Sequence, residues 1–375
     1  MKNNWDKVRL GDIVKTSSGG TPSKSHNEYY KDGNIPWILS GDISQGLIYS
    51  ANNYITQLGL ENSSAKFFPK KTVLVAMYGA TVGQVGILEI EATTNQAICG
   101  IYPNEKIDEK YLLFYFKSRK SFLLTLANGG AQPNISQEII RNLIIPLPPI
   151  EVQRNIAKLL EKSTKIISEY EKILNKYDAL IKSRFIEMFG DPVKNTKGWK
   201  TESLQQVAPA KPAKNNLTDK VWLLNLDMVE SQTGKVIDYL YVNILDTGNS
   251  TYQFDEGNVL YSKLRPYLNK VVIPEQPGIC TSELVPLRPT EKLNRYFLAN
   301  LLRTDFFVNF INEKVAGAKM PRVSMDTFRA FDCILPPIEL QNDFAAFVQQ
   351  IDKSKFEIWR NLELCVIIIQ KVFLL

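Results

Sequence analysis

Histidine is almost absent from this sequence, since His26 is the only one among 375 residues. A single histidine excludes an HExxH zinc site, which needs two, and leaves a histidine-based catalytic triad only if His26 serves in it. Because His26 lies in a polar stretch, we expect it in a surface loop. The scarcity of histidine therefore argues against both kinds of hydrolytic site.

Cysteine is also scarce. The four cysteines, Cys99, Cys280, Cys333 and Cys365, lie in apolar surroundings, and no two of them have CxxC spacing. Metal sites and disulfide frameworks use closer or regularly paired cysteines. We therefore predict free thiols, no metal site and a reducing compartment.

Long apolar runs are missing as well. No run approaches the ~18 residues of a membrane-spanning helix, because even the apolar segment 364–369 is followed by Gln370 and Lys371. The N-terminal segment MKNNWDKVRLGDIV contains no apolar core of signal-peptide length. We expect a cytoplasmic protein.

Motifs of phosphate and cofactor chemistry are not found. The segment GGTPSKS at 19–25 lacks the GxxxxGK spacing of a P-loop, so Lys24 is not a nucleotide-binding lysine, and no GxGxxG follows an expected strand. Neither NPPY nor DPPY occurs, although an amino-methyltransferase would need such a platform to hold a flipped adenine. The sequence thus predicts a protein without a catalytic site of its own.

What the sequence does contain is a long seven-residue periodicity. After Pro148 and Pro149, apolar residues recur every seven positions, and Ile156, Tyr170 and Tyr177 fill intervening places. The main row consists of Leu160, Ile167, Leu174, Ile181 and Met188. A straight helix drifts by about 20° per heptad against such a repeat, so the row predicts pairing with a second long helix.

A second helix of the same kind starts 188 positions later, where PPIEVQ at 148–153 recurs as PPIELQ at 336–341. One of its two apolar rows is interrupted by Lys355. The rows are Phe344, Ile351, Ile358, Cys365 and Val372, and Val348, Leu362 and Ile369. Upstream, the same offset aligns 128–136 with 316–324, so the chain is predicted to be a tandem duplication.

Each copy combines short strand patterns with one shorter helix. We expect strands at 35–39, 72–77, 85–90, 97–101, 142–147, 221–226 and 259–260, and helices at 111–126 and 296–310.

The predicted fold class is α/β: two homologous mixed α/β domains separated by two long antiparallel helices that form an intramolecular coiled coil, with approximate two-fold symmetry. The helices must be antiparallel because the second domain starts where the first helix ends and finishes where the second helix starts. The predicted parts are 1–147, 148–191, 192–335 and 336–375.

Two related domains on a helical spacer suit duplex DNA with two subsites, and the net charge of +6 permits a polyanionic partner. Three loop pairs are candidates for the contacts: 78–81 with 264–267, 94–96 with 281–283, and 132–134 with 320–322. On and flanking these loops, and in the separate segments 19–25 and 208–216, we nominate as DNA-contacting residues Thr21, Lys24, Tyr78, Thr81, Asn95, Gln96, Gln132, Asn134, Lys211, Lys214, Lys263, Arg265, Tyr267, Lys270, Ser282, Lys319 and Arg322.

The residue types in these loops favour recognition of bases and phosphates. Amide side chains make bidentate contacts to adenine and arginine to guanine, whereas lysines and hydroxyls mostly contact phosphates. Other interpretations remain open. Asn95 and Gln96 could cap a turn, Tyr78 could belong to the core, and Lys211 and Lys214 could lie in a solvated loop.

The first long helix carries a second apolar row beside its seam. This row is Leu159, Ile166, Ile173 and Leu180, whereas the equivalent positions of the second helix, Phe347, Ser354, Asn361 and Ile368, are only partly apolar. We hypothesise that the extra row on the first helix receives partner subunits or the flanking domain.

Several segments together resemble the specificity subunit of Type I restriction-modification systems. They are the duplicated LPPIE-x-Q start of each long helix, SRFIEMFGDP at 183–192 and GWK at 198–200, and the resemblance covers essentially the whole chain. It implies that each globular part is a target recognition domain, that the helices are the spacer between them, and that the target is a bipartite DNA sequence with an unspecified gap.

The resemblance also implies partners and cofactors. Two methyltransferase subunits would carry S-adenosylmethionine, and two restriction subunits in the larger complex would use ATP and Mg²⁺, so no cofactor is expected on this chain. Two other functions stay open: a coiled-coil interaction scaffold that does not bind DNA, and a nuclease or methyltransferase, which the missing motifs disfavour.

Overall fold

The computed structural model describes residues 5–127, 133–215, 217, 219–248, 250–314 and 321–373, with the backbone alone given for 368–372. The predictions made above for Gln132 and Lys319, and for the side chains of Ile368, Ile369 and Val372, fall outside this description. The chain divides into two compact units, Met1–Glu169 with Asn361–Leu375, and Tyr170–Arg360. Each unit therefore contains one α/β domain together with part of each long helix.

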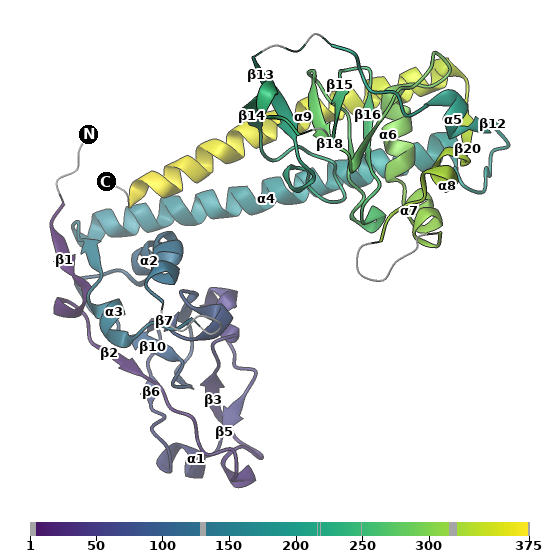
Figure 1. The fold of residues 1–375 in the computed structure, drawn as a ribbon. Coiled ribbons are helices and arrows are strands. Elements are labelled where there is room, and N and C mark those ends of the chain that lie inside the picture. The colour runs from purple at the N-terminus through teal and green to yellow at the C-terminus, as the bar shows by residue number, and fades with distance from the viewer. Residues whose placement is uncertain are drawn as a thin grey trace. The chain divides into compact units, whose positions relative to one another are not determined.

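Among the described residues of the first unit, the strands form three sheets, with orders β1-β11, β2-β10-β7-β8-β4 and β5-β3-β9-β6. Figure 1 labels β1, β2, β3, β5, β6, β7 and β10 of these strands. The strands are β1 (Lys7–Arg9), β2 (Thr16–Ser18), β3 (Ile35–Ile38), β4 (Leu47–Ile48), β5 (Tyr54–Ile55), β6 (Phe67–Phe68), β7 (Val73–Ala76), β8 (Val85–Leu88), β9 (Ala92–Thr94), β10 (Ile98–Ile101) and β11 (Ile144–Pro146). The shorter helices are α1 (Gln57–Glu61), α2 (Glu109–Thr125) and α3 (Gln137–Arg141). All five strands and the helix expected for this half are confirmed.

Helix α2 packs against strands β7 and β8 of the five-stranded sheet. It begins at Glu109 because Asp108 caps it, accepting hydrogen bonds from the backbone N–H groups of Lys110 and Tyr111 at 3.0 Å each. Its side chains Tyr111 and Phe116 are fully buried in the same apolar cluster as the side chains of β7 and β8. This packing makes α2 part of the scaffold that positions the loops after β7.

In the part of the second unit that the structure describes, the strands also form three sheets, with orders β12-β20, β14-β13-β18-β15 and β17-β16-β19. The strands are β12 (Lys200–Ser203), β13 (Lys220–Leu224), β14 (Leu240–Asn243), β15 (Thr251–Phe254), β16 (Val259–Ser262), β17 (Val271–Val272), β18 (Gly278–Thr281), β19 (Leu284–Leu287) and β20 (Asp332–Leu335). The shorter helices are α5 (Leu204–Val207), α6 (Arg295–Arg303), α7 (Asp305–Asn312) and α8 (Met325–Arg329). The two strands expected for this half are present as β13 and β16.

Strand pairing repeats from one unit to the other. Strand β16 pairs antiparallel with β17 and β19, as β7 does with β8 and β10. A central parallel pair, β3 with β9 in the first unit and β13 with β18 in the second, is flanked by antiparallel partners in both. The tandem duplication and the mixed α/β fold class are thus confirmed.

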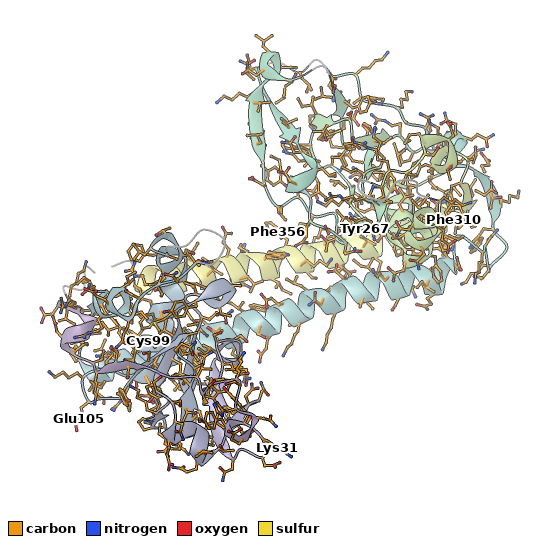
Figure 2. All side chains as sticks on the ribbon, turned by 60° about the horizontal axis from the view of Figure 1, so that its bottom comes forward. Lys31, Cys99, Glu105, Tyr267, Phe310 and Phe356 are labelled. Atoms are coloured by element: carbon orange, nitrogen blue, oxygen red, sulfur yellow. The ribbon has the colours of Figure 1, made fainter. Side chains whose placement is uncertain are left out.

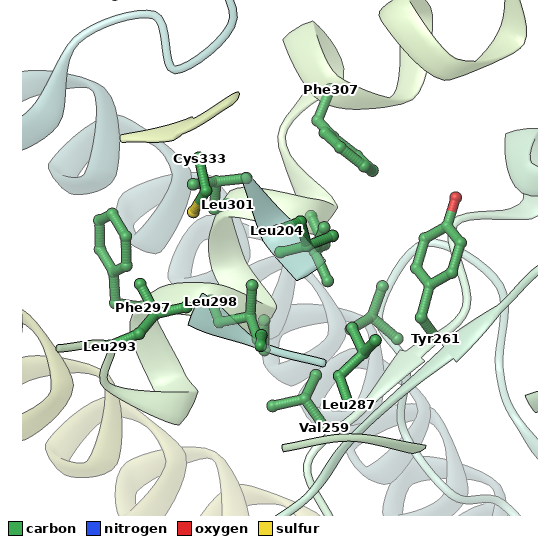
Figure 3. Packing of buried hydrophobic residues seen from close by; sticks show 14 of the residues in the cluster. Leu204, Val259, Tyr261, Leu287, Leu293, Phe297, Leu298, Leu301, Phe307 and Cys333 are labelled. Atoms are coloured by element: carbon green, nitrogen blue, oxygen red, sulfur yellow. The ribbon is translucent and has the colours of Figure 1, made fainter. Parts of the chain in front are cut away.

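The core of the second unit lies where α6 packs on β16 (Figure 3). Leu298 and Leu301 of the helix belong to the same buried cluster as Val259 of the strand, and all three are fully buried. Tyr261, also on β16, stacks on Phe328 with ring centroids 4.3 Å apart. This cluster fixes β16, from whose end the candidate loop 264–267 starts.

The helix expected at 296–310 is interrupted, which corrects the prediction. Thr304 lies between α6 and α7 with extended backbone, and its hydroxyl donates to Leu301 O at 2.7 Å and accepts from Phe307 N at 3.2 Å. Thr304 is the C-cap of α6 and the N-cap of α7. This double role favours two separate helices over one continuous helix. When the two helices are aligned by their N-cap residues Asp108 and Asn294, the equivalent of Thr304 in the first unit is Ser118, whose hydroxyl donates to Tyr115 O, and α2 continues through it.

The two expected long helices are α4 (Ile150–Phe189) and α9 (Ile338–Val372). Of their predicted seam residues, Leu160, Leu174 and Ile181 on α4 and Phe344, Val348, Ile351 and Leu362 on α9 are buried, whereas Ile167, Met188, Ile358 and Cys365 are partly buried. Within the second unit the pairing is antiparallel, because Phe185 of α4 contacts Phe344 while the earlier Asp178 contacts the later Lys355. None of the helices in the described ranges is long and apolar enough to cross a membrane.

Lys355, which interrupts the apolar row of α9, has a partner in the seam. Its ammonium forms an ion pair with Asp178 of α4 and lies 4.0 Å from Asp352, and its side chain is only 19% exposed. A buried lysine requires such a partner, because an isolated charge in the seam would be strongly destabilising. The interruption is therefore a specific cross-helix contact.

The repeated glutamine of the LPPIE-x-Q segment ties each long helix to its domain. Gln153 Nε2 donates to Lys106 O at 3.0 Å and Pro148 O at 2.8 Å, and its Oε1 accepts from Asp108 N at 2.9 Å. Gln341 makes the same three contacts, with Lys292 O at 3.1 Å, Pro336 O at 2.8 Å and Asn294 N at 2.9 Å. Both glutamines are fully buried, so the repeated motif fixes the junction between the long helix and the α/β domain.

Candidate nucleic-acid interface

The first and third nominated loops of the first unit meet directly after β7. Gly79 N donates to Pro133 O at 2.8 Å, Ile135 N donates to Met77 O at 2.9 Å, and Tyr78 and Asn134 form an antiparallel bridge. The side chain of Tyr78 is exposed, so the interpretation of this residue as part of the core is wrong. Two loops that are far apart in the sequence thus present one continuous surface.

The second loop joins the same surface. Met77 N donates to Ala97 O at 2.8 Å, which places the 94–96 turn beside the end of β7. Gln96 is exposed, and its side-chain oxygen accepts a hydrogen bond from the hydroxyl of Thr21. Asn95 uses its side-chain oxygen to accept from Ala97 N at 3.2 Å, as the turn-capping interpretation expects.

Other nominated residues of the first unit lie at the edge of this surface. Thr81 is partly exposed, and its hydroxyl donates to Tyr78 O at 2.9 Å. Lys24 is exposed three residues beyond Thr21, in the loop that Gly20 N anchors to Thr94 O at 2.9 Å. This loop therefore flanks the surface that contains the candidate base-reading residues.

The second unit joins its loops by the same main-chain hydrogen bonds. Arg265 N donates to Pro321 O at 2.8 Å, and Val323 N donates to Lys263 O at 2.9 Å. Leu264 and Arg322 form an antiparallel β-bridge. Lys263 N donates to the carbonyl of Glu283 at 3.0 Å, as Met77 N does to Ala97. The three loop pairs chosen by internal comparison therefore converge on one site in each unit.

Arg265 adopts an unusual backbone conformation at this site. Its φ of 50° lies in the left-handed region, at the position where the first unit has Gly79 with φ 68°. A residue with a side chain held in a sparsely populated region costs of order 1–3 kcal/mol, and such strain gathers at functional sites. The Arg265 side chain is exposed, as is the nearby Tyr267 (labelled in Figure 2).

One further contact was not anticipated. Arg322 Nη2 lies 2.9 Å from Glu283 Oε1, and the two residues come from the third and second loops. Glu283 lies in the nominated loop 281–283, but no sequence pattern distinguishes it from its neighbours. In the hydrogen-bonded frame Glu283 stands at the place of Ala97, whereas the sequence comparison of 94–96 with 281–283 pairs it with Gln96.

The nominated lysines of the second unit differ in their surroundings. Lys270 is half-buried, its ammonium donates to Leu226 O at 2.8 Å, and burial lowers its pKa, so its donor is already engaged within the protein. Lys211 and Lys214 are exposed and line an open depression of about 900 Å³ together with Gln253 and Arg288. These two lysines fit a phosphate-contacting role better than Lys270.

Ser282 connects the loop surface of the second unit to this depression. Its backbone N–H donates to Ser250 O at 3.1 Å, immediately before β15. Strand β15 also anchors the segment that carries Lys211 and Lys214, because Ala213 N donates to Gln253 O at 2.9 Å. The exposed lysines and the base-reading candidates are therefore linked through one edge strand.

His26 lies in a surface loop, as predicted. Its Nδ1 is 2.8 Å from Glu28 Oε1, and its ring stacks on Tyr29 with centroids 4.8 Å apart. Both side chains of this contact are at least half exposed. These contacts give His26 a local structural role at the surface.

The cysteines are reduced, as predicted. Cys99 (labelled in Figure 2), Cys280 and Cys333 are buried, and burial raises the pKa of each thiol to about 12. Across the part of the chain that the structure describes, no three His, Cys, Asp or Glu residues are grouped so that they could hold a metal ion. The buried thiols therefore act as small apolar core residues.

The extra apolar row of α4 is at the surface. Leu159, Ile166, Ile173 and Leu180 are between 37% and 51% exposed. Four large apolar side chains at seven-residue spacing lie on one face of a helix. On the equivalent face of α9, Phe347 and Ser354 are partly buried and Asn361 is exposed.

The chain is similar to proteins of one family. The family model for the Type I restriction modification DNA specificity domain matches residues 2–184 and 196–364. A Type I restriction enzyme MjaIX specificity subunit from Methanocaldococcus jannaschii is 26% identical over 385 aligned residues, covering 92% of this chain and 86% of that one. The EcoR124I/EcoR124II specificity subunit of Escherichia coli is 33% identical over 158 residues, covering 41% of this chain and 39% of that one.

Solved structures share the fold. The S subunit of a Type I restriction-modification system from M. genitalium aligns with a TM-score of 0.54 at 17% identity, covering 100% of this chain and 97% of that one. A chain from a structural study of assembly and conformational transition of the type I R-M system aligns with a TM-score of 0.57 at 16% identity, covering 99% and 97%. With two copies of the matched domain and equivalent loop surfaces in both, this chain belongs to the Type I restriction-modification DNA specificity family and has its role in recognising DNA targets.

Proposed function

We propose that this chain recognises a bipartite duplex DNA target, with one half read by each α/β domain, and positions methyltransferase subunits on it. The observation that carries the proposal is the repeated frame of main-chain hydrogen bonds that holds different side chains in the two units. Equivalent frames with different side chains suit the recognition of two different half-sites.

Phosphate contacts come from residues that surround this frame. Lys211, Lys214 and Lys263 supply positive charge in the second unit, and Lys24 in the first. Contacts of this kind position a protein on DNA without specifying sequence, and they release counterions on binding. Affinity should therefore fall steeply as the salt concentration rises.

Replacing Lys211 and Lys214 together by alanine should weaken binding to all duplexes to a similar extent. The slope of log K against log salt concentration should become shallower by about 2, because each phosphate contact contributes about 1. Fluorescence anisotropy of a labelled duplex at several salt concentrations measures both effects. Lys353→Ala, on an exposed position of α9, should leave the slope unchanged.

The same titration separates this function from that of a scaffold that does not bind DNA. A wild-type chain whose interactions are insensitive to salt, with no affinity for duplex DNA, would favour the scaffold. A slope that the double substitution leaves intact would remove the two lysines from the interface while leaving DNA recognition in place.

We propose that catalysis belongs to partner subunits: two methyltransferase subunits that carry S-adenosylmethionine and, in the larger complex, two restriction subunits that use ATP and Mg²⁺. The surface position of His26 supports this division, because the lone histidine is engaged with Glu28. Purified chain alone should transfer no labelled methyl group to DNA, and transfer should begin once methyltransferase subunits are added. Transfer by the chain alone would contradict the proposal.

The exposed row of α4 is proposed to bind partner subunits. Replacing Ile166 and Ile173 by lysine should prevent stable assembly with methyltransferase subunits, because charges would replace apolar contact surface at the centre of the row. Co-purification and size-exclusion chromatography with light scattering measure assembly. Ile186→Lys is the matched control, since Ile186 is comparably exposed on α4 but lies off the row. Normal assembly of the double variant would contradict the assignment.

A further inference from the structure

Arg322 and Glu283 form a two-point contact between two loops of the second unit. Arg322 Nη2 donates to Glu283 Oε1 at 2.9 Å, and Arg322 Nε is 3.5 Å from Glu283 Oε2. The arginine side chain is 53% exposed and the glutamate side chain 24%. The carboxylate therefore lies behind the guanidinium, which faces outward.

Both residues are attached to a fixed main-chain frame. Arg322 belongs to the bridge with Leu264, and the carbonyl of Glu283 accepts from Lys263 N at 3.0 Å. An arginine has five N–H donors, and the contact with Glu283 engages only one edge of the guanidinium. The remaining donors are thus held in one orientation before any ligand arrives, which reduces the entropy lost on binding.

The first unit has a matched difference at the same two positions. Asn134 occupies the place of Arg322 in the bridge, and Ala97 occupies the place of Glu283 as acceptor from the preceding strand. In the second unit the cation of Arg322 has the carboxylate of Glu283 behind it. In the first unit the neutral amide of Asn134 stands with Ala97, which carries no carboxylate. The two positions therefore differ as a pair between the copies.

The side chains at these positions have different base preferences. Arginine donates two hydrogen bonds to O6 and N7 of guanine, and a carboxylate can accept from N4 of cytosine. An asparagine amide both donates to and accepts from adenine at N6 and N7. A pre-oriented arginine therefore favours a G·C pair, whereas asparagine in the same frame favours an A·T pair.

We infer that Arg322, positioned by Glu283, reads a G·C pair in one half of the DNA target, and that Asn134 reads an A·T pair at the corresponding place in the other half. This inference rests on the proposed function and assigns a base class to each unit. Arg322 and Asn134 contact the bases, and Glu283 is a positioning residue.

The test uses the full chain expressed with its methyltransferase subunits, with the modified adenines mapped across a host genome. Arg322→Gln and Arg322→Ala should lower discrimination at one position of one half-site by roughly 10- to 100-fold, because each removes the guanidinium that donates to O6 and N7 of guanine. The other half-site should stay unchanged, which shows that the complex is folded and active. Glu283→Gln should relax the same position, because it frees the arginine from its fixed orientation.

The matched control is Glu202→Gln, which alters an exposed ion pair with Lys292 at 2.6 Å in the same unit. It should leave the target unchanged. The double substitution Ala97→Glu with Asn134→Arg should create a G·C requirement in the half-site that the Arg322 variants do not affect.

The outcomes separate this inference from the proposed function. Arg322 variants that modify the wild-type target with undiminished discrimination would overturn the inference and leave DNA recognition standing. Relaxation at Arg322 with no effect of Glu283→Gln would overturn the positioning role. A wild-type complex that neither binds nor modifies specific DNA would overturn the proposed function itself.

Discussion

Replacing Phe185 by alanine should lower the free energy of unfolding of the second unit by about 3–5 kcal/mol. Phe185 of α4 is 1% exposed and packs against two other helices. Its ring centroid lies 5.4 Å from that of Phe297 on α6 and 5.5 Å from that of Phe344 on α9. Phe189, one turn later on α4, is 5.0 Å away. Removing the ring leaves a cavity that these fixed neighbours cannot close.

Hydrogen–deuterium exchange followed by mass spectrometry checks this prediction, because it reports on the peptides of each unit separately. Ile186→Ala is the control: Ile186 is adjacent in sequence but 44% exposed, so its loss should cost far less. Equal protection of α6 peptides in the Phe185 variant and the wild type would show that the aromatic cluster does not hold the junction together.

Replacing Gln341 by leucine should destabilise the same unit by about 2–5 kcal/mol. Leucine has a similar volume, but it leaves the carbonyls of Lys292 and Pro336 and the N–H of Asn294 without their partner. Each buried polar group that loses its hydrogen bond costs about 1–3 kcal/mol. The start of α9 should then open more readily from the domain.

Urea unfolding followed by tryptophan fluorescence, with exchange mass spectrometry to locate the change, measures this effect. Gln349→Leu serves as the comparison, because Gln349 is exposed on the same helix. The corresponding substitution Gln153→Leu should weaken the first unit instead. If the Gln341→Leu and Gln349→Leu variants have the same midpoint of urea unfolding, the buried glutamine does not fix the junction between α9 and its α/β domain.

The long helices and the duplication could be predicted because they leave strong periodic signals in the sequence. Four heptads of apolar residues specify a seam, and the repeated PPIE-x-Q segment sets the alignment of the two copies. Strands such as β4, β5 and β6 have two residues each, which is too short for any alternation to be visible. Tertiary pairing alone defines them.

The position of the candidate site could be predicted, but not its internal contacts. Internal comparison identified all three loop pairs, because equivalent loops after equivalent strands must occupy equivalent places. The ion pair between Arg322 and Glu283 joins two loops through space, and so does the engagement of Lys270 with Leu226 O. No local pattern encodes either contact.

In both units the loops are joined through backbone atoms, at Gly79 and Pro133 in one and at Arg265 and Pro321 in the other. Main-chain bonds do not depend on which side chain each residue carries. Under the proposed function, substitutions at the candidate base-reading positions can therefore change the target of one α/β domain while the main-chain frame and the long helices stay the same. New target sequences would then need only a few mutations in one domain.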